Sequence, residues 1–138
     1  MNKSIIFFAF PAVIILLFSG CNKKDPSPAP LITIVQDANG VSSTFTGNGN
    51  VYTQQGVFMN SLTQASWAMS ISGGIRGSFR LQVKDGVGKI VIDETLVVGQ
   101  GITTLSGTTT TGTTQGNWAI IITLTNFDGV GSFSLSPA

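Results

Sequence analysis

The 138-residue sequence contains no histidine and only one cysteine. Histidine is the commonest side chain for proton transfer near neutral pH and a frequent metal ligand, so its absence removes many hydrolytic and metal-dependent mechanisms. A single cysteine cannot close a disulfide within the chain, and it cannot supply the group of thiolates that holds a structural zinc ion. We therefore expect neither a metal site nor thiol catalysis.

Charged side chains are also scarce, at 9% of all residues. Residues 31–138 carry four basic and five acidic side chains, and the basic ones do not form the stripe that a nucleic-acid-binding surface requires. Nucleic acid is therefore not an expected partner.

The few carboxylates do not form a catalytic pair. Asp93 and Glu94 are adjacent, so on a strand they point to opposite faces instead of converging as the carboxylates of a glycosidase do. Asp85 and Asp128 each precede a glycine in a turn, where one carboxylate falls short of the about six oxygens that calcium takes. The motifs of nucleophile elbows and phosphate-binding loops are missing too. The sequence predicts no catalytic residue, no metal and no enzyme activity.

The N-terminus has the organisation of an export signal. Lys3 supplies a positive charge, and residues 5–18 form an apolar run that only Pro11 interrupts. This run is shorter than the roughly 20 residues that a transmembrane helix needs. Its length is typical of the apolar core of a signal peptide.

The segment Phe18-Ser19-Gly20-Cys21 that follows resembles the lipobox of bacterial lipoproteins, a family that usually has leucine where Phe18 stands. The resemblance implies that residues 1–20 are removed and that Cys21 carries a covalent lipid, which is the only non-protein group we expect. Such lipid chains anchor a protein to a membrane without an inserted segment. Asn22 in place of aspartate argues against retention in the inner membrane, so we expect the outer membrane, on either its periplasmic or its surface side.

Residues 21–30 are rich in proline and predict a stiff tether, which leaves residues 31–138 as one domain. Apolar residues in this domain alternate with polar ones or form short runs, and glycine separates them. This pattern predicts an all-β antiparallel β-sandwich, with a small β-barrel as the alternative. The predicted strands cover residues 31–36, 41–46, 51–59, 65–72, 78–84, 89–98, 102–106, 117–125 and 131–136.

Two Asp-Gly segments, at residues 84–89 and 126–131, predict hairpin turns. The chain also repeats a pattern, since Trp67 and Trp118 each begin Trp-Ala-x-x-Ile and each is followed later by Gly-Ser-Phe-x-Leu. Two similar hairpins in comparable places of the two sheets would explain the repeat, and chance similarity between β segments would explain it equally well.

Two features are candidates for a binding surface, namely Tyr52 and the threonine-rich stretch at residues 108–116. Trp67 and Trp118 lie within apolar alternation and are expected in the core, whereas Tyr52, next to two glutamines, is the candidate for an exposed ligand-binding aromatic. Residues 108–116 are rich in threonine, which predicts either a solvated loop or a flat array of hydroxyl groups.

Residues 118–136 resemble the C-terminal hairpins of small Bacteroidetes lipoproteins, which implies a compact all-β protein at the outer membrane and implies no activity. Our leading hypothesis is a non-enzymatic binding or accessory module for a glycan or an envelope protein. The rival hypothesis is a structural subunit that pairs its edge strands with a neighbouring sheet, which uncharged edges would favour.

Overall fold

The computed structural model describes residues 31–110 and 113–138, and these residues form seven strands and no helix. The predicted signal peptide (1–20) and lipidated tether (21–30) lie outside the described residues. No helix long and apolar enough to cross a membrane occurs in the part of the chain that the structure describes. The strands are β1 (Leu31–Asp37), β2 (Gly40–Asn48), β3 (Tyr52–Asn60), β4 (Ala65–Lys84), β5 (Ile90–Val97), β6 (Thr104–Thr108) and β7 (Gly116–Pro137).

All strand pairs are antiparallel, and β4 and β7 pair with each other along most of their length. The end of β7 also pairs with β2, and the start of β4 with β6, which builds a first layer in the order β1-β2-β7-β4-β6. The start of β7 pairs with β3, and the end of β4 with β5, which builds a second layer in the order β3-β7-β4-β5. Each long strand therefore belongs to both layers.

The two layers pack face to face as a β-sandwich. The ring of Phe45, from β2 in the first layer, lies 4.5 Å from the ring of Phe79, from the second-layer half of β4. On one side of the sandwich, Ile34 of β1 lies against Gly56 of β3. β1 and β3 share no hydrogen-bond ladder, so the sheet does not close on itself there. The predicted sandwich is confirmed, in preference to the closed barrel.

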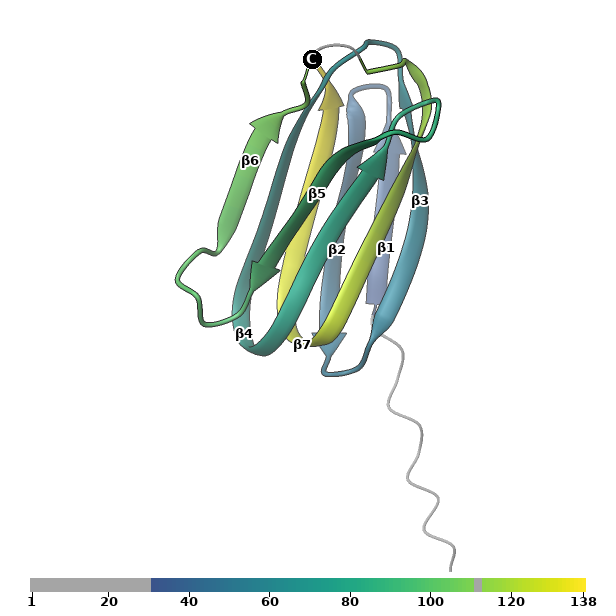
Figure 1. The fold of residues 1–138 in the computed structure, drawn as a ribbon. Coiled ribbons are helices and arrows are strands. Elements are labelled where there is room, and N and C mark those ends of the chain that lie inside the picture. Colours follow the sequence, from purple (N-terminus) through teal and green to yellow (C-terminus); the bar gives the residue numbers. More distant parts are fainter. Residues whose placement is uncertain (1–30, 111–112) are drawn as a thin grey trace, which may run out of the picture.

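The long strands cross between the layers at bends, which Figure 1 shows at the lower end of the view. In β4 the pairing with β7 shifts register between Ser72 and Ser78. Gly74 and Gly129 meet at the crossing, where a Cβ on Gly129 would lie 2.6 Å from the Cα of Gly74. Glycine at the bends thus lets two backbones approach more closely than any side chain would allow.

The prediction of a hairpin turn at residues 126–131 is wrong, because this segment lies within the continuous strand β7. A residue with positive φ does occur in this segment, as expected for a turn, but it is Asn126 with φ 49° and it lies at the bend of the strand. Phe127 is fully buried and packs against Phe45, and a Cβ on Gly131 would collide with the Phe45 ring. The core therefore holds this segment extended.

The repeated pattern belongs to two bent strands and not to two hairpins, so that part of the prediction is also wrong. The Trp67 motif lies in the first layer and its Gly-Ser-Phe continuation in the second, whereas the Trp118 motif lies in the second layer and its continuation in the first. The antiparallel pairing of β4 with β7 brings the matching halves into opposite layers.

The other Asp-Gly turn is confirmed: Gly88 N–H donates to the carbonyl of Asp85 between β4 and β5. The uncharged segment Trp118–Leu124 lies between β3 and β4, in the middle of its layer. A central position removes the aggregation risk that such a strand would carry at an edge.

Candidate binding face

Strand alternation sorts the first layer into a core face and an outer face. On β2, Val41 and Phe45 are buried and point inward, whereas Ser42 and Thr44 are exposed and point outward. The ladder carries this alternation across all five strands of the layer. The outward residues, which we call the hydroxyl face, are Thr33, Val35, Ser42, Thr44, Thr46, Ser66, Ala68, Ser70, Ser72, Thr104, Ser106, Thr108, Val130, Ser132, Ser134 and Ser136.

The hydroxyl groups of this face stand in rows across the strands. One row consists of Thr33, Thr44, Ser132, Ser70 and Thr104, which are direct neighbours in the ladder on β1, β2, β7, β4 and β6. Neighbouring strands lie about 4.8 Å apart, so this row spans roughly 19 Å. The hydroxyl oxygens of Ser70 and Ser132 lie 2.8 Å apart and share a hydrogen bond.

The second row of the face is mixed. It contains Val35, Ser42, Ser134, Ala68 and Ser106 in the same strand order. Its alanine and valine add short apolar patches between the hydroxyl groups. No charged side chain belongs to either row.

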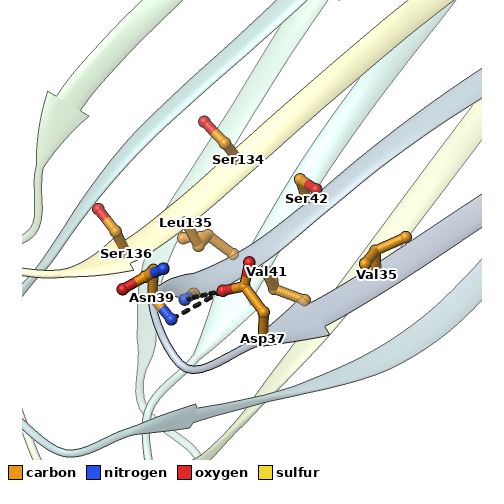
Figure 2. Close-up of a pocket in the computed structure, with 9 residues that line it drawn as sticks. Val35, Asp37, Asn39, Val41, Ser42, Ser134, Leu135 and Ser136 are labelled. Carbon is orange, nitrogen blue, oxygen red and sulfur yellow. Dashed lines mark hydrogen bonds between the residues drawn. The ribbon is translucent and has the colours of Figure 1, made fainter.

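Two shallow hollows lie on this face and share Ser42 and Ser134 in their linings. The larger, of about 360 Å³, lies over β2, β7 and β4 and reaches Thr104 at the start of β6. The smaller, of about 210 Å³, lies at the β1–β2 turn, and Figure 2 shows Ser42, Ser134 and Ser136 projecting there from the same side of the sheet.

Asp37 is the charged residue at the margin of the smaller hollow, and its carboxylate is hydrogen-bonded to the backbone of the β1–β2 turn. Its Oδ1 accepts hydrogen bonds from the backbone N–H groups of Asn39, at 2.7 Å, and Gly40, at 3.0 Å (Figure 2). This is the local capping that aspartate commonly provides in turns. The carboxylate therefore has a structural role at this end of the face. At the opposite end, beyond Val130, Asp128 and its ladder neighbour Arg76 are the next charged residues.

Of the predicted site residues, Cys21 lies outside the described residues, and Tyr52 lies on β3 in the other layer. The Tyr52 ring is half-buried against the core, and its hydroxyl donates to Oε1 of Gln54 at 3.1 Å. The structure does not bring Tyr52 near the hydroxyl face. Trp118 is a core residue, as predicted, and Trp67 is half-buried and packs against the core.

The threonines of the stretch at residues 108–116 lie in different environments. Thr108 belongs to the hydroxyl face, whereas Thr109 and Thr113 are buried at one end of the sandwich, and residues 111–112 lie outside the described part. The Thr109 hydroxyl accepts a hydrogen bond from the N–H of Ala65. The hydroxyl array lies elsewhere, on serine and threonine residues at every second position of several strands. That alternation is visible in the sequence, but its meaning depends on which strands become neighbours.

Asp85 ties together the end of the sandwich that the threonine stretch covers. Its Oδ1 accepts from the N–H groups of Val87 and Lys89, and its Oδ2 from the N–H of Thr114. Burial of Asp85 opposes its ionisation, but these three donors together hold the pKa of Asp85 below its ordinary value. The carboxylate therefore connects the β4–β5 turn to the chain that enters β7.

The acidic residues on β5 do not form a second site. Asp93 forms a two-pronged ion pair with Arg80, with both N–O distances at 2.6 Å, and this pairing lowers the pKa of Asp93. The described residues contain no group of three or more acidic, histidine or cysteine side chains that could hold a metal ion.

Comparisons with known proteins show a remote likeness. Neither a protein-family model nor a curated protein sequence matches the chain. Similar solved structures include the arabinose-bound α-L-arabinofuranosidase MgGH51, at 12% identity and a TM-score of 0.39, over 82% of this chain and only 23% of that enzyme. Another is the family 11 carbohydrate-binding module from Clostridium thermocellum in complex with a β-1,3-1,4-mixed-linked tetrasaccharide, at 14% identity and a TM-score of 0.32, over 78% of this chain and 79% of that module. Because both TM-scores are low, these likenesses carry no argument about a ligand or an activity.

Proposed function

We propose that this chain is a non-enzymatic binding module, anchored by a lipid on Cys21 in the cell envelope, and that its hydroxyl face binds a neutral glycan. The observation that carries the proposal is the uncharged row of five hydroxyl groups across the first layer. Serine and threonine hydroxyls both donate and accept hydrogen bonds, which matches the hydroxyl groups of a sugar. Because the two rows carry no charge, a neutral ligand can bind over them without removing an ion from water.

The shape of the face supports a shallow contact with an extended ligand. Its hollows are open, and most of the residues that line them are serine, threonine, alanine or valine. Short side chains let a ligand approach the sheet closely, and they lose little rotamer entropy when they bind. A polymer that runs over several strands would gain many weak hydrogen bonds, each contributing about 1 kcal/mol.

A matched pair of variants on β7 tests the proposal. Ser132→Glu places a carboxylate in the hydroxyl row, and Thr123→Glu places the same group on the outer face of the second layer, opposite Arg80. Against a panel of neutral polysaccharides in affinity electrophoresis, we expect the Cys21→Ser chain to be retarded by at least one of them. Ser132→Glu should weaken that retardation about tenfold, which corresponds to about 1.4 kcal/mol, and Thr123→Glu should leave it unchanged.

Equal losses in the two variants, or no retardation of a folded chain by any polysaccharide, would contradict the proposal. The anchor is tested separately. The native chain should partition with membranes and Cys21→Ser should not, so membrane association of the Cys21→Ser chain would remove this part of the proposal.

A further inference from the structure

The edges of the two layers differ in how accessible they are to another strand. Edge strands carry N–H and C=O groups without partners, and proteins usually protect them with charges, bends or covering segments. The edges are β1 and β6 in the first layer and β3 and β5 in the second. β1 and β3 lie against each other, and β5 carries Asp93 and Glu94 at mid-length. Among the described strands, β6 is the edge that is both open and uncharged, and Figure 1 shows it at the left margin of the molecule.

The backbone of β6 offers a regular set of hydrogen-bonding groups. Thr109 N–H donates to the carbonyl of Ala65, and Ile71 N–H donates to the carbonyl of Thr103, so odd-numbered residues of this segment face β4. Along an antiparallel strand, successive residues direct their N–H and C=O groups to opposite sides. The N–H and C=O groups of the even-numbered residues Thr104, Ser106 and Thr108 therefore point to the open side. Three donors and three acceptors are thus available to a new strand.

The geometry points to a second copy of this chain as the partner of β6, with two β6 strands paired antiparallel about a two-fold axis at Ser106. In this register Ser106 faces its own counterpart, and Thr104 faces Thr108 of the second copy. Leu105 faces Gly107 of the second copy, so a large side chain meets a residue without one. No charge meets a like charge in the ladder, because β6 has none. Such a self-complementary contact closes at two copies.

The apolar side of β6 supports the same partner. Trp67 and Leu105 are only half-buried, and the Trp67 ring lies over Gly107, 3.2 Å from where a Cβ would stand. Leu105 of the second copy would lie opposite Gly107, beside this indole ring. Leu105 and Gly107 of the second copy form a non-hydrogen-bonded pair, the kind in which facing residues lie closest. The contact would therefore shield the exposed apolar surface of Leu105 and Trp67 from water.

Pairing through β6 would also join the two hydroxyl faces. The first row would run from Thr104 to Thr108 of the second copy and on to its Ser66 and Ser136, which are ladder neighbours of Thr108. The joined surface would cross ten strands, twice the five of one layer. A lipid-anchored pair would therefore present one long neutral face, although the pairing itself does not depend on the ligand.

Cross-linking of the full chain in bacterial membranes tests the pairing. Ser106→Cys places two thiols across the axis, and the Cα atoms of a hydrogen-bonded antiparallel pair lie about 5.5 Å apart, within disulfide reach. Thr44→Cys, exposed on the same face but on β2, is the matched control, and it retains Cys21 like the parent. After mild oxidation we expect at least about tenfold more disulfide-linked dimer from Ser106→Cys than from Thr44→Cys or the parent.

A second variant tests the same contact without a disulfide. Ser106→Lys places two ammonium groups opposite each other across the axis, while the bonds between β6 and β4 are retained. In detergent, sedimentation should give a dimer for the parent chain and a monomer for Ser106→Lys, with unchanged circular dichroism. Dimer yields equal to the control, a parent chain that sediments as a monomer, or a Ser106→Cys cross-link only to a different protein would each overturn the proposal.

Discussion

The two outer faces of the sandwich come from the same long strands and yet differ in chemistry. On the first-layer half of β7, the outward residues that follow Val130 are Ser132, Ser134 and Ser136, which all bear hydroxyl groups. On the second layer, the end of β4 presents Arg80 and Lys84, and β5 adds Asp93, with charges that face solvent. β4 shows the contrast within one strand, because its outward residues are Ser66, Ala68 and Ser70 in the first layer and include Arg80 and Lys84 in the second.

The bends make this division possible. A straight strand has one outward set of residues along its length. β4 and β7 cross between layers, so each contributes two outward sets, and these sets belong to different surfaces. The unit that forms a surface is therefore half a long strand together with its neighbours in one layer.

The largest expected effect separates the shared core from the hydroxyl face. Phe45→Ala should lower the free energy of unfolding by about 3–5 kcal/mol, because the ring fills the space between the layers against Phe79 and Phe127. Thr44→Ala, the next residue and outward on the hydroxyl face, should change it by less than about 0.5 kcal/mol. Urea unfolding measures both, and a similar loss in the two variants would mean that the hydroxyl face is part of the packed core.

The next effect concerns the end of the sandwich. Asp85→Ala should lower the free energy of unfolding by about 1.5–3 kcal/mol, because three backbone N–H groups lose a charged acceptor. Glu94→Gln, at an exposed carboxylate of β5, is the control and should have little effect.

The same variant has a pH signature. The folded pKa of Asp85 lies below its ordinary value of 3.8, so the stabilisation is present above that value and is lost as pH falls through the folded pKa. Unfolding of the parent between about pH 2 and pH 6 should show a loss of stability below about pH 4. The slope should be smaller in Asp85→Ala, and an unchanged slope would show that Asp85 does not contribute to it.

Removing hydroxyl groups without adding charge sharpens the contrast between the faces. Ser70→Ala combined with Ser132→Ala removes the hydrogen-bonded pair in the first row. Retardation by the glycan that binds the parent should fall about five- to tenfold, as expected for about 1 kcal/mol of lost hydrogen bonding. Thr123→Ala, on the other face of β7, should bind like the parent, and a loss of binding there would relocate the site.

The smallest effect is expected on the charged face. Asp93→Asn removes the charge that Arg80 pairs with, but both side chains are about two-fifths exposed or more, at 38% and 47%. Exposed ion pairs contribute little to stability because water screens them, so thermal unfolding should change little and glycan binding not at all. A binding loss equal to that of the Ser70 and Ser132 double variant would show that the ligand contacts both faces.

Sequence reasoning located the strands well and the connections less well. The Asp85 turn was predictable because both neighbouring runs alternate and pair locally. The segment from Asn126 to Gly131 carries the same signal, yet it stays extended because Phe127 and Phe45 fill the core there and β4 continues to pair alongside. The site was harder to predict. Tyr52 was the most visible candidate, whereas the hydroxyl face consists of common residues whose significance lies in their register.

The sequence by itself determined that this protein is an all-β domain with little charge, because alternation, β-branched residues and glycine act locally and need no distant partner. The export and lipidation signal that we propose for residues 1–21 would likewise be read as a linear segment, by a peptidase and acyltransferases. Only the tertiary structure decided that β4 and β7 each serve two layers, that Thr33 and Thr104 share a row, and that β6 is left as an open edge. These features depend on which strands become neighbours, and contacts between residues far apart in the chain decide that.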